Sequence, residues 1–270
     1  MLSDIDLERY ARQAIMPDIG EEGQERLLAA RVLLVGAGGL GSPAGFYLAA
    51  AGIGHVSLVD DEHVEISNLN RQILHTTNSI GTAKVEQAAR TMSALNPGMT
   101  VEPVLARLTD SNADVLVGAH DLVLDCSDNA DTRYLLGATA HRMGRPLVFG
   151  GAVRTEGQLA VFQSGVEGYQ DTPCYRCVFP DAADAALAPG CSEAGILGPV
   201  TGIIGAMQAL EAVKLLLGFG TSLTGHMLLF DGRHGSFMDI TTQRRADCAV
   251  CGSDTAGQKA DQTAGQTARK

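Results

Sequence analysis

Short apolar runs alternate with helical patterns along most of the chain. An apolar run at 32–35 ends in a glycine turn, an alanine-rich stretch follows at about 42–51, and residues 55–59 then alternate apolar and polar positions before Asp60. A short apolar run bounded by glycine is typical of a buried parallel strand. These segments therefore predict one strand–helix–strand unit within about thirty residues.

The same alternation continues into the second half of the chain. We expect helices at 83–95, 132–143 and 203–217, parallel strands at 101–105, 122–126 and 146–149, and antiparallel strands near 158–163 and 226–230. This order of elements predicts an α/β fold with a Rossmann-like, mostly parallel sheet, helices on both faces and C-terminal antiparallel strands.

Other segments are expected to surround or interrupt this sheet. The sequence predicts an N-terminal helical arm at 1–30 with breaks at Gly20 and Gly23, followed by one α/β domain at 31–252. A mobile loop is expected at 181–190, and a disordered tail at 253–270, where the apolar content is too low for folding.

Composition and charge exclude several classes of protein. The chain has 270 residues, 45% of them hydrophobic, and a formal net charge of −11. Negative charge repels phosphate backbones and anionic membranes, and a 4% aromatic content without Trp offers few stacking surfaces, which argues against a nucleic-acid partner. The N-terminus lacks a signal-peptide pattern, and Gln208, Glu211 and Lys214 interrupt the most apolar stretch. We therefore expect no membrane partner and a cytoplasmic location.

The sequence GAGGLG directly follows the first predicted strand. Glycines at Gly36, Gly38, Gly39 and Gly41 permit a tight turn in which backbone N–H groups at a helix N-terminus approach a phosphate. Asp60, at the end of the next strand, is placed to accept hydrogen bonds from ribose hydroxyls. Strand, turn, helix and acid together predict nucleotide binding, against the alternative of a structural glycine turn.

Charged residues that follow the predicted strands favour a nucleoside triphosphate. Arg71 and Lys84 suit charge that grows on a leaving pyrophosphate, for which hydride transfer from NAD has no need. Asp128 follows a strand at the same edge of the sheet and is a candidate Mg²⁺ ligand. Two alternatives are that these are solvated loop charges and a helix N-cap, or that the chain is an NAD-dependent oxidoreductase with a structural zinc.

Two C-x-x-C pairs, Cys174 with Cys177 and Cys248 with Cys251, predict a zinc site. Four thiolates suit tetrahedral Zn²⁺, and a closed four-cysteine site is structural because no coordination position stays open. The interval between the pairs exceeds zinc-finger spacing, so the metal would fix the C-terminal end of the chain to a central loop. A thioredoxin-like redox pair is the alternative.

The other two cysteines have different surroundings. Cys126 lies in an apolar predicted strand and is interpreted as a small core residue. Cys191 follows the loop residues 188–190 and is a candidate nucleophile whose reactivity depends on its neighbours.

Taken together, these motifs resemble one family. The run RYARQ at 9–13, the loop GAGGLG, the block SNLNRQ at 67–72, Lys84, DCSDN at 125–129, the C-x-x-C pairs and Cys191 occur in the chain. Over about residues 5–252 the chain resembles the ThiF/MoeB family, bacterial relatives of the ubiquitin-activating E1 adenylation domain. The resemblance implies an ATP-dependent adenylyltransferase that activates the C-terminal Gly-Gly carboxylate of a ubiquitin-like sulfur carrier as an acyl-AMP.

The resemblance also implies roles for individual residues. Arg12 would reach across a homodimer interface to the partner's triphosphate, and Cys191 lies where some members bind the carrier covalently while others work without it. Arg71, Lys84 and Asp128 would act on ATP and Mg²⁺. The complete implied ATP site is Gly36, Gly38, Gly39, Gly41, Asp60, Ser67, Asn68, Asn70, Arg71, Lys84, Asp128 and Asn129.

The carrier and its pathway stay open at this point. The segments at 177–181 and 230–232 are similar to thiamine-pathway members, which use a ThiS-type carrier, whereas 151–158 is similar to molybdopterin-pathway members, which use a MoaD-type carrier. A sulfurtransferase or cysteine desulfurase is a further partner. A related branch acts on tRNA, which the net charge disfavours, and a non-catalytic carrier-binding scaffold is the remaining alternative.

Overall fold

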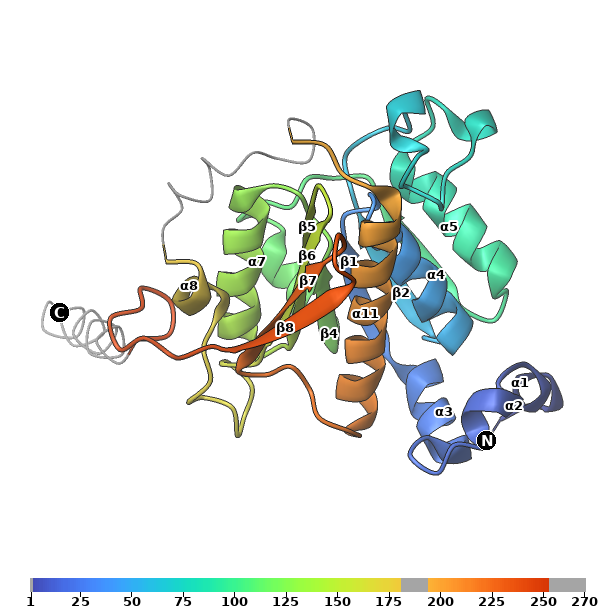
Figure 1. Cartoon of the computed structure of the whole chain (residues 1–270). Helices are drawn as coiled ribbons and strands as arrows, with labels where there is room; N and C mark the ends of the chain where they lie inside the picture. Colours follow the sequence, from blue (N-terminus) through green and yellow to red (C-terminus); the bar gives the residue numbers. More distant parts are fainter. Residues whose placement is uncertain (1, 181–193, 253–270) are drawn as a thin grey trace, which may run out of the picture.

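One eight-stranded sheet organises the residues that the computed structural model describes, 2–180 and 194–252 (Figure 1). Its strands lie in the order β3-β2-β1-β4-β5-β6-β7-β8. The first five strands in this order are parallel, and β6, β7 and β8 extend the sheet in antiparallel fashion. The predicted α/β fold, with a mostly parallel sheet and C-terminal antiparallel strands, is confirmed.

The strands are short, as expected of a sheet that helices cover. Their bounds are β1 Arg31–Val35, β2 His55–Val59, β3 Thr100–Val104, β4 Leu122–Asp125, β5 Leu147–Val153, β6 Glu156–Phe162, β7 His226–Asp231 and β8 Ser236–Thr241.

Helices cover both faces of the sheet (Figure 1). One face carries α3 (Gly20–Ala29), α4 (Gly41–Ala51), α5 (Lys84–Leu95) and α11 (Gly198–Leu217), and the other carries α6 (Ala113–Gly118), α7 (Ala130–Met143) and α8 (Tyr175–Val178). The short helices α1 (Asp4–Arg9) and α2 (Ala11–Ala14) precede this arrangement, and η1 (Ile66–Asn68) and η2 (Thr77–Ser79) lie between β2 and α5.

The central strand β1 contributes to two hydrophobic cores at once. Val32 and Leu34 pack into the core shared with α4 and α11, whereas Leu33 and Val35 pack into the core shared with α7. A strand that is covered on both faces needs apolar residues at successive positions. This is why β1 appears in the sequence as an unbroken apolar run.

The N-terminal arm is fixed by side chains of the RYARQ run. Tyr10 is buried, Gln13 Nε2 donates to the Ala51 carbonyl at 3.1 Å, and Arg9 Nη1 donates to the Leu95 carbonyl at 3.1 Å. Carbonyls in the last turn of a helix have no intrahelical partner. The arm therefore satisfies the C-terminal ends of α4 and α5.

Several boundaries differ from the sequence prediction. α11 begins at Gly198 rather than 203, because Pro199 is tolerated in the first helical turn. β5 continues past Phe149 to Val153, because the glycines at 150–151 pair with β6. The predicted break at Gly23 is wrong, since this residue lies inside α3.

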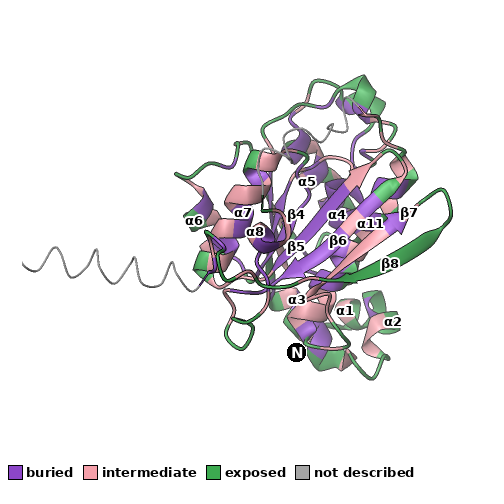
Figure 2. Cartoon of the chain, turned by 60° about the vertical axis from the view of Figure 1, so that its left-hand side comes forward, coloured by how far each residue is buried: buried purple, intermediate pink, exposed green. Residues whose placement is uncertain are grey.

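Three short or exposed elements have no counterpart in the prediction. α6 and α8 are only 6 and 4 residues long, and β8 is an edge strand exposed along its whole length (Figure 2). The expected mobile loop at 181–190 and the expected disordered tail at 253–270 lie outside the described residues.

α11 is long and apolar enough, by length and composition, to cross a membrane. The helix is longer than the stretch expected at 203–217, and its extra first turn brings it to this length. Half of its apolar window is nevertheless buried inside the protein, where it packs against α4, β5 and β6. This environment is that of a core helix.

Gly205 allows α11 to lie close to the start of α4. A Cβ at Gly205 would lie 2.3 Å from the Leu40 carbonyl oxygen and 2.5 Å from Pro43 Cγ. Gly202, one turn earlier in the same helix, would have no neighbour within 4 Å of a Cβ. The two glycines thus provide a matched pair.

We expect Gly205→Ala to lower the free energy of unfolding by about 1–3 kcal/mol, because the added methyl group overpacks the contact between α4 and α11. Gly202→Ala should leave it unchanged or raise it by up to about 1 kcal/mol, because alanine favours the helix. Denaturant unfolding of both variants measures the difference. Equal effects of the two substitutions would contradict the described contact.

Candidate nucleotide site and metal centre

A cavity of about 1030 Å³ opens at the carboxyl ends of the parallel strands. This edge is where open α/β sheets bind their ligands. All residues of the implied ATP site except Gly41 line the cavity: Gly36, Gly38, Gly39, Asp60, Ser67, Asn68, Asn70, Arg71, Lys84, Asp128 and Asn129. The structure thus brings these residues together from the segments after β1, β2 and β4 and the start of α5.

The four glycines of the loop have two different roles. Gly36 adopts a φ of 98°, and a Cβ on Gly41 would lie 1.9 Å from the Gly36 carbonyl oxygen, so these two glycines are required by the turn itself. Gly38 and Gly39 line the cavity, and a Cβ on Gly38 would meet nothing closer than 3.7 Å. At Gly38 the missing side chain therefore leaves room for a ligand to approach the backbone.

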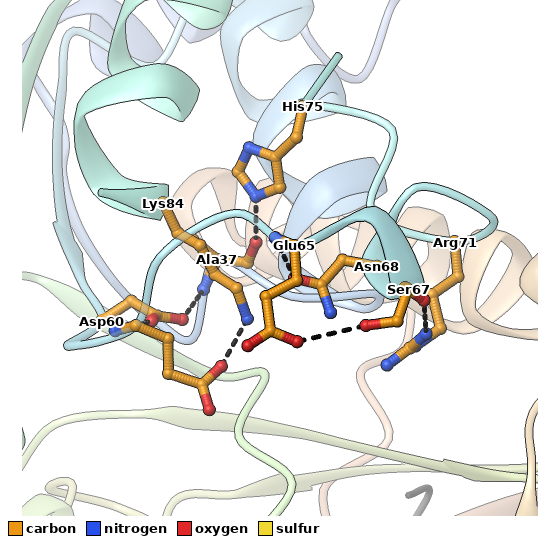
Figure 3. A network of polar contacts seen from close by, with 9 residues as sticks. Ala37, Asp60, Glu65, Ser67, Asn68, Arg71, His75 and Lys84 are labelled. Carbon is orange, nitrogen blue, oxygen red and sulfur yellow. Dashed lines mark hydrogen bonds and ion pairs between the residues drawn. The ribbon is translucent and has the colours of Figure 1, made fainter. Parts of the chain in front are cut away.

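Asp60 supports the glycine loop and also faces the cavity. Its Oδ2 accepts a hydrogen bond from the Ala37 N–H at 2.8 Å, and its Oδ1 accepts one from the Glu62 N–H at 2.8 Å (Figure 3). Burial raises the pKa of this carboxyl, while the two backbone donors and Lys84 oppose the shift. Each oxygen retains a lone pair, so Asp60 is able to accept hydrogen bonds from a ligand.

His75 holds the same loop from the other side. Its Nε2–H donates to the Ala37 carbonyl at 2.9 Å, as Figure 3 shows. Burial is the main cause that lowers the pKa of His75, and the charge of Lys84 adds to it. A neutral imidazole whose Nε2 carries the proton is therefore the form that fits. No sequence motif distinguishes this histidine from the others in the chain.

Lys84 is a buried cation at the start of α5. Its Nζ donates to Glu62 Oε2, while only 4% of the Lys84 side chain and 67% of the Glu62 side chain are exposed. The ammonium group is thus fixed by its surroundings, whereas the carboxylate reaches it from solvent. An anionic ligand in the cavity is able to replace Glu62 as the counterion of Lys84.

The SNLNRQ block folds on itself and presents Arg71 to the cavity. Arg71 Nη1 donates to the Ser67 carbonyl at 3.0 Å (Figure 3) and to Asn70 Oδ1 at 3.3 Å. Asn68 Oδ1 accepts from the Glu65 N–H at 3.0 Å, which closes the turn of η1. These contacts occupy only part of the guanidinium group, and its other N–H groups remain for a ligand.

Asp128 is the exposed acid of the DCSDN segment and lines the cavity. The residue after it, Asn129, is the N-cap of α7 and accepts from the Thr132 N–H at 2.9 Å. Mg²⁺ binds one or two carboxylates together with phosphate oxygens. Asp128 supplies one carboxylate at the cavity edge, which is the kind of ligand that such a site uses.

Other lining residues have no place in the motifs that the sequence analysis used. Val35, Val59, Ala106 and Leu108 give one part of the cavity an apolar wall, and Arg133 contributes a cation from α7. No periodicity in the sequence indicates that 106–108 reaches this edge. Only the three-dimensional order β3-β2-β1-β4 brings it there.

Arg12 is an expected site residue that does not line the described cavity. Arg12 is exposed on α2 and is absent from the lining, whereas its neighbours in the RYARQ run fix the arm. Cys191 lies outside the residues that the structure describes, which resume at 194. Cys126 is a buried residue whose Sγ–H donates to Gln208 Oε1 at 3.3 Å, in keeping with the predicted core role.

Four buried cysteines form a compact cluster at the start of α8. The Sγ of Cys174 lies 3.8 Å from that of Cys177 and 3.5 Å from that of Cys248, and the Sγ atoms of Cys177 and Cys251 are 3.3 Å apart. Four sulfurs around one zinc, each at about 2.3 Å from it, would be about 3.8 Å apart. The cluster fits a metal ion such as Zn²⁺.

The chemistry of the cluster supports the same interpretation. Burial raises the pKa of the Cys177 thiol to about 11, so a bound cation is what would keep this sulfur ionised. The Arg245 backbone N–H donates to the Cys177 Sγ at 3.4 Å. Tyr175, between the first two cysteines, is buried against Phe149 and fixes this part of the chain to the core.

A Rossmann-like sheet whose glycine loop, strand-end acid and two cations surround one cavity is typical of a nucleotide-binding domain. The chain belongs to the ThiF family, whose sequence profile matches residues 10–250. The resemblance derived from the motifs is thereby confirmed.

Relatives in three domains of life match nearly the whole chain. The sulfur carrier protein adenylyltransferase of Thermus thermophilus is 46% identical over 249 residues, which are 92% of each chain. The SAMP-activating enzyme E1 of Haloferax volcanii is 46% identical over 91% of this chain and 89% of its own. The adenylyltransferase and sulfurtransferase MOCS3 of Bos taurus is 48% identical over 93% of this chain, which spans about half (54%) of that longer protein.

Solved structures share the fold at low sequence identity. Escherichia coli MccB with succinimide aligns with a TM-score of 0.78 at 20% identity, over 94% of this chain and 75% of its own. The same enzyme with ATP aligns with a TM-score of 0.72 at 22% identity, over 85% of this chain and 68% of its own. These likenesses support the architecture alone.

We expect freshly purified protein to contain one zinc ion per chain, and Cys174→Ser to lose the metal and lower the melting temperature. The energy of binding a structural zinc is part of the folding energy, which is the reason for the effect. Elemental analysis and thermal unfolding measure the two quantities. Cys126→Ser, at a cysteine outside the cluster, is the control and should keep its zinc. A metal-free wild-type protein would contradict the four-cysteine site.

Proposed function

We propose that this protein is an ATP-dependent adenylyltransferase that activates the C-terminal carboxylate of a ubiquitin-like sulfur carrier as an acyl-AMP. The observation that carries the proposal is the convergence of the glycine loop, Asp60, Arg71, Lys84 and Asp128 on one cavity. Relatives named as sulfur carrier protein adenylyltransferases, at 46% identity over nearly the whole chain, support this class of substrate.

The lining of the cavity suits the parts of ATP. The apolar wall formed by Val35, Val59 and Leu108 suits the adenine base, and Asp60 suits the ribose hydroxyls. The backbone at Gly38 and the N-terminal end of α4 suit the phosphates, because a helix N-terminus carries partial positive charge.

The chemical problem in this reaction is repulsion between two anions. The carboxylate of the carrier is ionised at pH 7, so it attacks the α-phosphorus without a general base. A bond forms between the carboxylate oxygen and the α-phosphorus, the bond from that phosphorus to the β-phosphate oxygen breaks, and pyrophosphate leaves. Arg71 and Lys84 stabilise the charge that develops on the phosphates, and fixed cations do so without reorganising at the moment of reaction.

Asp128 would hold Mg²⁺ at the edge of this site. The ion, when bound, would neutralise charge on the phosphate oxygens. Glu62 would release Lys84 when the triphosphate enters, because the two anions compete for one ammonium group. Because the Glu62 side chain is largely exposed, its carboxylate stays hydrated when it leaves Lys84, and the exchange costs little desolvation energy.

The proposal extends to partners that support the later steps. The carrier is of the MoaD or ThiS type, and the pathway is molybdopterin or thiamine biosynthesis in the cytoplasm. A sulfurtransferase or cysteine desulfurase would supply sulfur to the acyl-AMP, and Cys191 is the candidate thiol for covalent capture at that stage. Arg12 would complete the site of a second copy in a homodimer, since it lies outside the cavity of its own chain.

We expect Asp128→Ala and Arg71→Ala each to lower carrier-dependent ATP–pyrophosphate exchange by at least about a hundredfold, because both remove charge from the phosphate end of the site. Parallel assays with a MoaD-type and a ThiS-type carrier identify the substrate. Asp131→Ala, at an exposed acid outside the cavity lining, is the matched control and should keep full exchange. Normal exchange in either site variant, or tight NAD binding by the wild type, would refute the assignment.

Arg12→Ala is expected to abolish exchange as a pure protein and to regain it when mixed with the inactive Asp128→Ala variant. If the two variants reassort at random, half of the dimers contain one subunit of each kind. In such a dimer, the site with an intact Asp128 receives Arg12 from the other subunit, so one site of the two is complete. About a quarter of wild-type activity should therefore return. Exchange assays on the unmixed and mixed proteins measure this. Failure of the mixture to recover activity would show that Arg12 does not act across a dimer interface.

A further inference from the structure

Ser127 is held on three of its polar groups by two neighbouring side chains. Asp125 Oδ1 accepts from the Ser127 N–H at 3.0 Å and from its Oγ–H at 2.6 Å. On the other side of the residue, Arg133 Nη2 donates to the Ser127 carbonyl at 2.9 Å. Ser127 directly precedes Asp128, so this clamp fixes the backbone from which the proposed metal ligand projects.

The described hydrogen bonds of the Asp125 side chain all go to Ser127. Its side chain is fully buried, Oδ1 takes both bonds from Ser127, and Oδ2 has no hydrogen-bond partner in the part of the chain that the structure describes. Burial raises the pKa of the Asp125 carboxyl, and the charge of Arg133 counters that shift. No other described group donates a hydrogen bond to this carboxylate.

The strand itself does not require a carboxylate at this position. β4 pairs on one side with β1, where Asp125 is opposite Val35, and on the other side with β5, where it is opposite Phe149. Both ladders use backbone groups only. A buried charge costs desolvation, and an apolar residue would hold such a strand at least as well. The contribution that the Asp125 side chain makes here is the pair of charge-assisted bonds to Ser127.

Arg133 is fixed just as firmly. Its guanidinium group lies 5.2 Å from the centre of the Phe149 ring and reaches the wall of the cavity. On the far side of Asp128, the side chain of Asn129 caps α7. Asp128 therefore projects from a segment whose preceding and following residues are both tied to rigid elements.

We propose that Asp125 and Arg133 are positioning residues for the adenylation reaction: they clamp Ser127 and thereby set where Asp128 presents its carboxylate to the metal–nucleotide complex. The assignment rests on the proposed function only in requiring that a nucleotide and a divalent ion occupy this cavity. The identity of the carrier does not enter it.

Asp125→Asn tests the clamp because it keeps the size of the side chain but replaces the charge-assisted bonds to Ser127 by weaker neutral ones. Mn²⁺ titration of the protein with a non-hydrolysable ATP analogue, followed by electron paramagnetic resonance, reports the metal site directly. We expect the Mn²⁺ affinity to fall by about ten- to a hundredfold, the range found when the residues behind a metal ligand are changed. Metal-free binding of the analogue should stay within about twofold of wild type.

Glu211→Gln is the matched control. Glu211 is 5% exposed, accepts hydrogen bonds from Lys214 and from the Leu223 N–H, and lies outside the cavity lining. The same change from carboxylate to amide at a buried site should lower the melting temperature and leave the Mn²⁺ affinity unchanged. If Asp125→Asn does not fold, Ser127→Ala replaces it, with an expected loss of at least about threefold.

The outcomes separate the clamp from a general structural role and from the proposed function. Wild-type Mn²⁺ affinity in a folded Asp125→Asn protein overturns the assignment. A parallel loss of metal-free analogue binding also overturns it, because the substitution would then distort the whole cavity. If wild type binds Mn²⁺ with the analogue but shows no pyrophosphate exchange with either carrier, the proposed function fails while the Mn²⁺ data still decide the clamp. Absence of Mn²⁺ binding by wild type overturns both.

Discussion

Four parallel strands end on a single row of paired residues, and the fifth, β5, crosses this row at Phe149. Val104 is opposite Val59, Val59 opposite Val35, Val35 opposite Asp125, and Asp125 opposite Phe149. Because the ladder fixes this row, the segments that follow β1, β2 and β4 start side by side. A slip of one residue would move a loop by about 3.3 Å along the edge and turn every side chain of that strand to the other face. The geometry of the whole site derives from this register.

The cavity brings several cations together in an acidic protein, and acidic residues such as Glu62 and Asp128 line it as well. The protein carries a net charge of −11, yet the cavity contains Lys84, which is 3% exposed, together with Arg71 and Arg133. A buried cation without a counterion is costly. Glu62 supplies that counterion from solvent, and a neutral His75 nearby adds no further positive charge. The result is a fixed ammonium group whose counterion is exchangeable.

Sequence reasoning reached the parts of the site that have local signatures. The glycine loop, Asp60 and the two C-x-x-C pairs depend on spacing along the chain, and the structure groups them as their chemistry requires. The positioning roles of Asp125 and Arg133 were not predicted, because they depend on burial and on contacts with Ser127. No pattern in the sequence indicates either. The edge strand β8 was not predicted either, because all its residues are exposed and its sequence therefore lacks the alternation of a strand with one buried face.

The four-cysteine cluster has a consequence for this edge strand. β8 ends at Thr241, and the chain reaches Cys248 after a short segment, so a bound metal ties the end of the strand to α8. On β8, Phe237 and Met238 are 49% and 62% exposed. An edge strand with apolar side chains is a template for strands of other molecules. A metal ion bound to the four cysteines would restrain this strand and so oppose aggregation, a role quite separate from catalysis.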